Sequence, residues 1–150
     1  MLSIKEKLYN ACVAFVEKRF LKIESTIADI QTSLLSETKS SAGDKHETGR
    51  AMLQIEREKA GQQLAEIGKV KEALSKVETT KTHNTIAIGS VVYTSKSNYY
   101  IAISAGELKF NNEKFYAISP STPIGQLLMG KAEGERISFR EQNFAIEKVC

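Results

Sequence analysis

Two interleaved series of apolar residues, each spaced by seven positions, run through the first quarter of the chain. One series is Leu2, Tyr9, Val16, Ile23 and Ile30, and the other is Val13, Phe20, Ile27 and Leu34. Apolar steps that alternate between three and four residues form a narrow stripe along a helix, which is typical of packing against one partner helix. No Gly or Pro interrupts this segment. We therefore expect one long helix over residues 2–38.

The partner helix is predicted over residues 45–78. Its first series is Leu53, Ala60, Ile67 and Leu74, and Val70 and Val77 belong to the second. Nearer the turn, Glu56 and Gln63 are expected to occupy the positions of the second series. These polar residues weaken the seam, which is the apolar stripe along which the two helices are expected to pack. Gly61 and Gly68 also lie inside this helix, and each costs about 1 kcal/mol relative to Ala.

The two series can be aligned as an antiparallel hairpin. The facing pairs Leu34 with Leu53 and Phe20 with Ile67 have position numbers that add up to 87. The midpoint therefore falls near residues 43 and 44, in the segment 39–44, which has the small and polar residues of a turn. At about 1.5 Å per residue, the first helix is roughly 55 Å long.

Residues 79–84 are polar and aperiodic, and we interpret them as a linker. Beyond them the apolar period changes to two, which predicts an α+β domain over residues 85–150 built on an antiparallel sheet. The strand candidates are residues 85–94, 99–104, 114–118, 136–139 and 144–149, and one short helix is expected over residues 123–129.

Composition narrows the class of protein. The 150 residues allow one or two small domains, and 41% hydrophobic with 26% charged residues is typical of a soluble globular chain. The sequence lacks an apolar run long enough for a membrane span and a recognisable secretory signal, so we expect a cytoplasmic protein without a membrane partner. The net charge of +3 is too small for autonomous tight binding to nucleic acid. A hairpin that pairs within one chain predicts a monomer.

Motifs of a self-contained enzyme are absent from the sequence. It has no Gly-rich phosphate loop and no nucleophile elbow. Cys12 and Cys150 cannot form a zinc site by themselves, and the two histidines, His46 and His83, fall in the predicted turn and linker. We therefore do not expect catalysis by this chain alone, nor a stably bound cofactor.

An acidic pair lies at the predicted turn. If the second helix begins here, Asp44 and Glu47 lie on one side of its first turn. Two carboxylates in this position can share a Mg²⁺ ion whose other ligands come from a partner. The same pattern is also a capping box that satisfies backbone amides, and the residues alone favour this structural interpretation. The basic residues Lys39, Lys45 and Arg50 surround the pair and could steer the turn toward phosphate.

The segment 118–135 holds both prolines of the chain and resembles a known signature. It is similar to the Ser-Pro-x-Ser-Pro-Leu-Gly-x-Ala-Leu-Leu-Gly-Lys-x-x-Gly-Asp motif of the bacterial Gre transcript-cleavage factors. The matching residues are Ser119, Pro120, Pro123, Gly125, Leu128, Gly130, Lys131 and Gly134. Residues 88–92 resemble the Gly-Ser-x-Val strand of the same family, so the resemblance covers about residues 85–149.

The other half of the Gre family is an antiparallel coiled-coil hairpin with an acidic motif at its tip. Gly43, Asp44 and Glu47 match the first part of that motif, whereas residues 48–51 depart from the rest. The resemblance implies a C-terminal domain similar to the FKBP-type fold that docks on RNA polymerase through residues of the matching segment, namely Ser119, Pro120, Pro123, Gly125, Gly130 and Lys131. It also implies a hairpin that enters the secondary channel of the polymerase.

In that family the tip carboxylates help to hold a second Mg²⁺ ion beside the metal of the polymerase, which stimulates cleavage of backtracked RNA. The resemblance thus assigns Asp44 and Glu47 a role in trans, with an indirect effect on the 3′ end of the nascent RNA. Two alternatives stay open. The departure at residues 48–51 suggests a regulator that binds the channel without promoting cleavage. An FKBP-like prolyl isomerase or chaperone module is a remote alternative, because the second half is expected to have too few aromatic residues to line a proline pocket.

Overall fold

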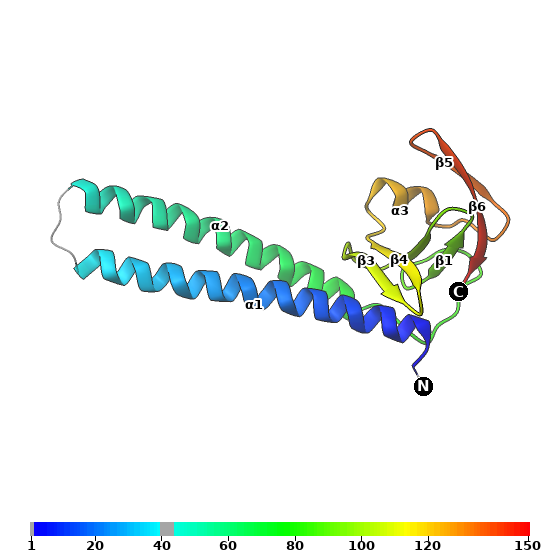
Figure 1. Cartoon of the computed structure of the whole chain (residues 1–150), viewed down its shortest axis with the longest axis horizontal. Coiled ribbons are helices and arrows are strands. Elements are labelled where there is room, and N and C mark those ends of the chain that lie inside the picture. The colour runs from blue at the N-terminus through cyan, green and yellow to red at the C-terminus, as the bar shows by residue number, and fades with distance from the viewer. Residues whose placement is uncertain (1, 40–43) are drawn as a thin grey trace. The chain divides into compact units, whose positions relative to one another are not determined.

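The computed structural model describes the backbone of residues 2–39 and 44–150 and the side chains of residues 2–37 and 48–150. A long N-terminal helical hairpin is followed by a six-stranded, mostly antiparallel sheet with one short helix (Figure 1). The predicted fold class is confirmed. Val16–Lys71 form one compact unit, and the rest of the described chain forms the other. The division into residues 1–78, 79–84 and 85–150 stays a prediction.

The hairpin consists of α1 (Ile4–Lys39) and α2 (Asp44–Ser75). These helices begin and end within a few residues of the predicted bounds. Helix α2 ends three residues earlier than expected because a tighter turn follows it, in which the Val77 amide donates to the Leu74 carbonyl. The predicted midpoint falls between the two helices. The connecting residues 40–43 lie outside the described residues.

The predicted seam is buried along α1. Val16, Ile23 and Ile30 are buried, and the intervening positions Val13, Phe20, Ile27 and Leu34 are half-buried. On α2 the first series is buried at Ala60, Ile67 and Leu74. In the second series, Val70 is half-buried and Val77 is buried as expected, but the expectation for the two positions nearer the turn was wrong. Glu56 and Gln63 are exposed, and the half-buried positions are Arg57 and Leu64, because alternating steps of four and three from Leu53 lead to them.

Contacts between α1 and α2 agree with the predicted antiparallel register. The Lys71 ammonium lies 3.2 Å from the Glu17 carboxylate, and these position numbers add up to 88. At the other end of the unit, a Cβ placed on Gly49 would lie 3.4 Å from the Glu37 Oε1 atom, and these numbers add up to 86. Lys71 also lies 5.2 Å from the centre of the Phe20 ring, which is within cation–π range.

The sheet domain has six strands in the spatial order β3-β4-β2-β1-β6-β5. The strands are β1 (Val91–Thr94), β2 (Asn98–Ile101), β3 (Gly106–Phe110), β4 (Glu113–Ile118), β5 (Arg136–Phe139) and β6 (Gln142–Val149), and the short helix is α3 (Pro123–Leu128). All neighbouring strands are antiparallel except β2 and β4, which are parallel. The expected antiparallel sheet therefore contains one parallel pair.

Strand β3 was missed by the sequence analysis. Its residues alternate between charged and apolar side chains, but only Leu108 and Phe110 of the apolar ones are large. The signal that could have found it is the pair Asn111 and Asn112, which both have positive φ and close a two-residue hairpin between β3 and β4. Arg140 and Glu141 close the β5–β6 hairpin in the same way.

The expected strand over residues 85–94 is shorter in the structure. Only Val91–Thr94 pair as β1, and Thr85 forms an isolated bridge with Ala132. Gly89 interrupts the strand with a φ of +94°, and a Cβ there would lie 3.0 Å from the Glu78 carbonyl oxygen. The backbone turns at Gly89, and this turn requires glycine.

Both faces of the sheet are buried. On one face, α3 covers a core formed by Ile86, Val92, Ile101, Leu128, Ile137, Phe144 and Ile146. On the other face, Tyr100 of β2 is fully buried close to Cys12 and Tyr9 of α1. Lys5 is also buried, and its ammonium donates to the Lys81 carbonyl at 2.6 Å. The first turns of α1 therefore belong to the sheet domain.

Burial shifts the pKa values of the side chains that lie between the first turns of α1 and the sheet. It raises the pKa of the Cys12 thiol to about 12 and raises the pKa of Tyr100 above its ordinary value. The Tyr100 hydroxyl is buried without a hydrogen-bond partner. Burial likewise lowers the pKa of Lys5, which the charge at Cys150 partly offsets. Both Cys12 and Tyr100 thus stay protonated at neutral pH.

Candidate functional sites

The predicted acidic pair lies in the first turn of α2. The helix begins at Asp44, so Asp44 and Glu47 are three residues apart at its N-terminal end. Residues at this spacing share one side of a helix, and the N-terminal end carries the positive pole of the helix dipole. The side chains of residues 44–47, including Lys45 and His46, and that of Lys39 at the end of α1 lie outside the described residues. The role of these residues stays a prediction.

Two described residues next to this turn refine the predicted cluster. Arg50 lies in the second turn of α2 and is half-buried, so it is not simply a solvated cation at the end of the hairpin. Glu37 of α1 places its carboxylate against Gly49 of α2. Glu37 was not among the predicted site residues. The predicted register could have found it, because it brings residue 37 opposite residues 49 and 50.

The hairpin also carries a shallow basic hollow of about 250 Å³. It is lined by Arg19, Lys22, Ile23 and Thr26 of α1 and by Gln63 of α2. Arg19, Lys22 and Thr26 recur at helical spacing on one side of α1. The hollow thus places two cations, Arg19 and Lys22, on one side of α1.

The segment that resembles the Gre signature forms a loop followed by α3. The Thr122 side chain accepts a hydrogen bond from the Gly125 amide at 3.1 Å and donates one to the Ser119 carbonyl at 2.7 Å. Thr122 is thus the N-cap of α3, and Pro123 occupies the first helical position, where proline is favoured. The Ser119 and Ser121 hydroxyls lie 2.8 Å apart. The residues Ser119, Thr122 and Pro123 therefore have local structural roles.

The glycines of this segment have separate structural reasons. A Cβ on Gly125 would lie 2.3 Å from the Ser119 carbonyl oxygen, so no larger residue fits there without a shift of the loop. Gly130 ends α3 with a φ of +82°, and its amide donates to the Ile86 carbonyl at 2.8 Å. The Ile86 amide in turn donates to the Lys131 carbonyl. These bonds fix the end of the segment to the residues before β1.

Part of the same segment faces solvent. Ser121, Pro123, Gln126 and Leu127 are exposed, whereas Pro120 and Lys131 are half-buried and Gly125 is buried. Of the six residues predicted to dock on polymerase, Pro123 and Gly130 are exposed, and only Pro123 offers an exposed side chain. The outer surface of α3 near Pro123 and Leu127 is thus the part of the predicted docking motif that a partner can reach.

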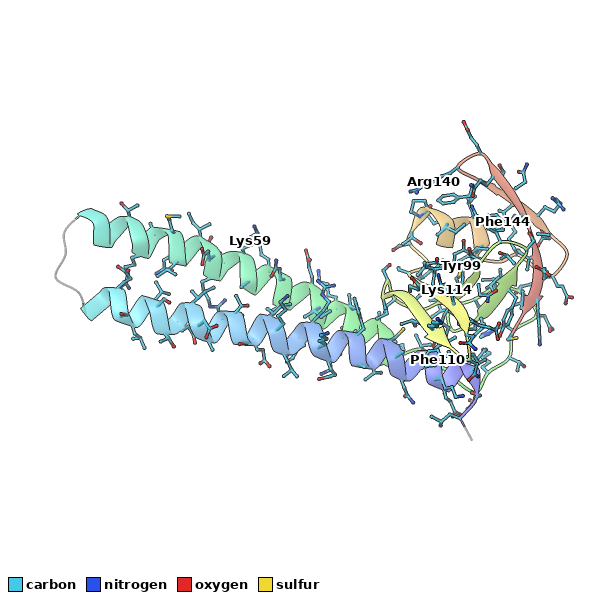
Figure 2. The ribbon with its side chains drawn as sticks, in the orientation of Figure 1. Lys59, Tyr99, Phe110, Lys114, Arg140 and Phe144 are labelled. Atoms are coloured by element: carbon cyan, nitrogen blue, oxygen red, sulfur yellow. The ribbon has the colours of Figure 1, made fainter. Side chains whose placement is uncertain are left out.

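A second hollow lies on the sheet domain, and we call it the aromatic hollow. Its volume is about 430 Å³, and it is lined by Lys96, Ser97, Tyr99, Tyr116, Ile118, Phe139, Arg140, Gln142 and Phe144. Figure 2 labels Tyr99, Arg140 and Phe144, which come from β2, the β5–β6 turn and β6. Four aromatic rings therefore gather here from strands that are distant in sequence. The sequence-based objection that the domain has few aromatic residues for a proline pocket was wrong.

Another hollow, of about 550 Å³, lies beside the predicted linker. Lys76, Lys81, His83, Ile88 and Met129 are among the residues that line it. Burial lowers the pKa of His83, and the nearby charge of Lys5 lowers it further. The His83 Nδ1 atom is buried without a hydrogen-bond partner. His83 is therefore a neutral imidazole at physiological pH.

Within the described side chains, no group of three or more His, Cys, Asp or Glu residues lies close enough to hold a metal ion. Across the described helices, none is both long and apolar enough to cross a membrane.

Comparison with known proteins gives a distant likeness. No protein-family model matches the chain, and no curated protein matches it. A solved structure described as that of the transcription factor Gfh1 aligns with 89% of this chain and 90% of its own chain, at 16% sequence identity and a TM-score of 0.35. A likeness at this level assigns neither a family nor an activity.

Proposed function

We propose that this protein is a transcription factor that binds RNA polymerase and acts through the acidic pair at the start of α2. The observation that carries the proposal is the start of α2 at Asp44, which puts Asp44 and Glu47 in the first helical turn after the hairpin connection. The segment 118–135, which resembles the Gre signature, independently supports the same class. A helix of 36 residues such as α1 spans about 54 Å, long enough to reach into a deep channel.

The finer proposal is that the hairpin enters the secondary channel and stimulates cleavage of backtracked RNA. Carboxylate oxygens are the ligands that Mg²⁺ prefers, and this ion is commonly held by only one or two protein carboxylates. The donor set of Asp44 and Glu47 therefore fits a Mg²⁺ ion whose remaining ligands belong to the polymerase. Such an ion, when bound, activates water and stabilises charge in phosphoryl displacement. The chain would thus be a cofactor in trans, and not an enzyme.

The experiment is RNA cleavage in a purified, backtracked elongation complex. Asp44→Asn and Glu47→Gln are each expected to slow stimulated cleavage by about 10²-fold or more, because each removes a group that stabilises charge in the transition state. Affinity for polymerase, measured by fluorescence anisotropy, should change less than about twofold. Glu58→Gln is the matched control, because Glu58 is an exposed carboxylate of the same helix farther from its start.

A second candidate is a regulator that occupies the channel without promoting cleavage. The departure of residues 48–51 from the family motif favours it. In the same assay it predicts polymerase binding and slower elongation, with no cleavage by the unaltered protein. Cleavage that is unaffected by Asp44→Asn would contradict the proposed role of the acidic pair.

A further inference from the structure

The aromatic hollow is built by two pairs of strands that β1 separates in the sheet. On one side, Tyr99 of β2 and Tyr116 of β4 are direct partners in the parallel pair, and their ring centres lie 6.2 Å apart at an angle of 43°. On the other side, Phe139 and Phe144 come from the β5–β6 hairpin. The Tyr116 side chain is 37% exposed. Tyr116 thus presents open aromatic surface to a ligand, with the half-buried Tyr99 and Phe139 beside it, whereas Phe144 belongs to the core and forms the floor.

The charged groups of the hollow are of one sign. Lys96 and Arg140 are its charged lining residues, and neither Asp nor Glu is among the described residues that line it. The Arg140 guanidinium carbon lies 5.0 Å from the centre of the Phe139 ring, so a cation is held directly over one aromatic wall. An anionic group next to an apolar group is the ligand chemistry that complements this arrangement.

The position of the hollow limits the backbone conformation of a peptide ligand. The edge strands of the sheet are β3 and β5, and three of the four aromatic residues in the hollow lie on inner strands, with Phe139 at the end of β5. A ligand on the sheet face meets side chains and cannot extend the hydrogen-bonded ladder, so strand addition does not apply. A helix is about 10–12 Å wide with its side chains, so it would lay only part of one face on a hollow of about 430 Å³. Polyproline II segments have no internal hydrogen bonds and dock on aromatic-lined grooves at a low entropic cost.

We propose that the aromatic hollow binds a proline-containing, acidic segment of a partner protein. Prolyl rings pack on the faces of Tyr99 and Tyr116, and a neighbouring carboxylate pairs with Arg140 or Lys96. Single-stranded nucleic acid fits less well, because a stacking platform for it is normally combined with a basic groove that follows the phosphate backbone. The hollow offers two cations at one site. This binding function is separate from the proposed action on RNA cleavage.

The test uses the full chain and three fluorescein-labelled decapeptides in an anisotropy titration. They are an alternating Glu-Pro peptide, the matched Lys-Pro peptide and the matched Glu-Ala peptide. We expect the Glu-Pro peptide to bind with a Kd of about 10–100 μM, and each of the other two to bind at least about tenfold more weakly. Labelled decauridylate serves as the nucleic-acid probe.

Substitutions then locate the binding site. Tyr116→Ala and Arg140→Glu are each expected to weaken Glu-Pro binding by at least about tenfold. Lys109→Glu is the matched control for charge, because Lys109 is an exposed cation of β3 that does not line the hollow, and it should leave the Kd within about twofold. Arg140 has a positive φ in the β5–β6 turn, so its substitution could disturb that turn. Lys96→Glu is therefore a second variant, because Lys96 lies in the exposed β1–β2 turn.

Three results would overturn the proposal. Equal affinity for the Glu-Pro and Glu-Ala peptides would remove the need for proline. Tighter binding of decauridylate than of the Glu-Pro peptide would assign the hollow to nucleic acid. An unchanged Kd in a folded Tyr116→Ala variant, checked by circular dichroism, would place the peptide elsewhere on the protein.

Discussion

The helical hairpin and the loop before α3 use glycine in opposite ways. In α2, Gly68 lies in the helix interior, and a Cβ there would meet nothing within 4 Å. In the loop and α3, Gly125 is in contact with the Ser119 carbonyl, and a Cβ would overlap it. The hairpin is a regular element with a narrow seam, so most of its surface is free to change. The residues around α3 are fixed by their own short-range contacts.

This difference matters for experiments on function. A substitution on the exposed side of the hairpin tests a role in binding or catalysis without a large effect on folding. Substitution of Gly125 or Thr122 in the motif around α3 alters the loop itself, because each of these residues holds it by contact or hydrogen bond. Exposed side chains such as Pro123 and Leu127 are the better probes of polymerase docking.

The largest effect is expected for Gly125→Ala. The added Cβ would lie 2.3 Å from the Ser119 carbonyl oxygen and 2.8 Å from Thr122 Oγ1, so the loop must move and the N-cap of α3 is strained. We expect the free energy of unfolding of the sheet domain to fall by about 3 kcal/mol. Urea denaturation measures it. A loss below about 0.5 kcal/mol would show that the loop adapts, and it would remove the contrast with the hairpin.

The next largest effect concerns pH. The pKa of the Cys12 thiol is about 12 in the folded chain, against an ordinary value of 9.0. Between these values the unfolded chain releases the proton while the folded chain retains it. Stability is therefore fully present below pH 9 and falls as the pH rises toward 12, by up to about 1.4 kcal/mol per pH unit from this group.

The measurement is urea denaturation from pH 8 to 10.5, with Cys12→Ala as the comparison. The variant removes the thiol, so its stability should decline less steeply than that of the unaltered protein, although tyrosines contribute to both curves. Parallel curves for the two proteins would mean that Cys12 is accessible to water. Such a result would also contradict the packing of the first turns of α1 on the sheet domain.

The smallest effect is expected for Gly68→Ala, and it has the opposite sign. Alanine in an open helix interior loses less backbone entropy on folding than glycine does, so helix stability should rise by about 1 kcal/mol. Thermal unfolding followed by circular dichroism at 222 nm measures it. Destabilisation by this substitution would reveal a close contact on the outer side of α2 and would weaken the contrast with Gly125.

The sequence was most informative where neighbouring contacts follow a short and regular period. Steps of three and four residues along α1 predicted which positions are buried and how the two helices align, as the contacts of Glu17 and Glu37 with α2 confirm. The same period did not reveal that Lys5, Leu8 and Cys12 form a second buried stripe on α1, because the surface that covers them lies in the sheet domain.

The candidate sites also differ in whether the sequence could predict them. The sequence alone identified the acidic pair and the segment around α3, because a helix start and a proline–glycine turn are local features. It missed β3, which has only two large apolar residues, and the parallel pairing of β2 with β4, which joins strands across the intervening strand β3. The aromatic hollow was also hidden, because Tyr99 and Phe139 come from distant strands.

The sequence by itself determined the hairpin, its register and the position of the acidic pair. Helix geometry places residues three and four positions apart on one side, so the apolar pattern of the hairpin can be recognised from residues that are close together in the sequence. Only the tertiary structure decided which aromatic and basic side chains meet around the hollow. Strand order in a sheet depends on pairing between distant segments, and no local period of the chain encodes it.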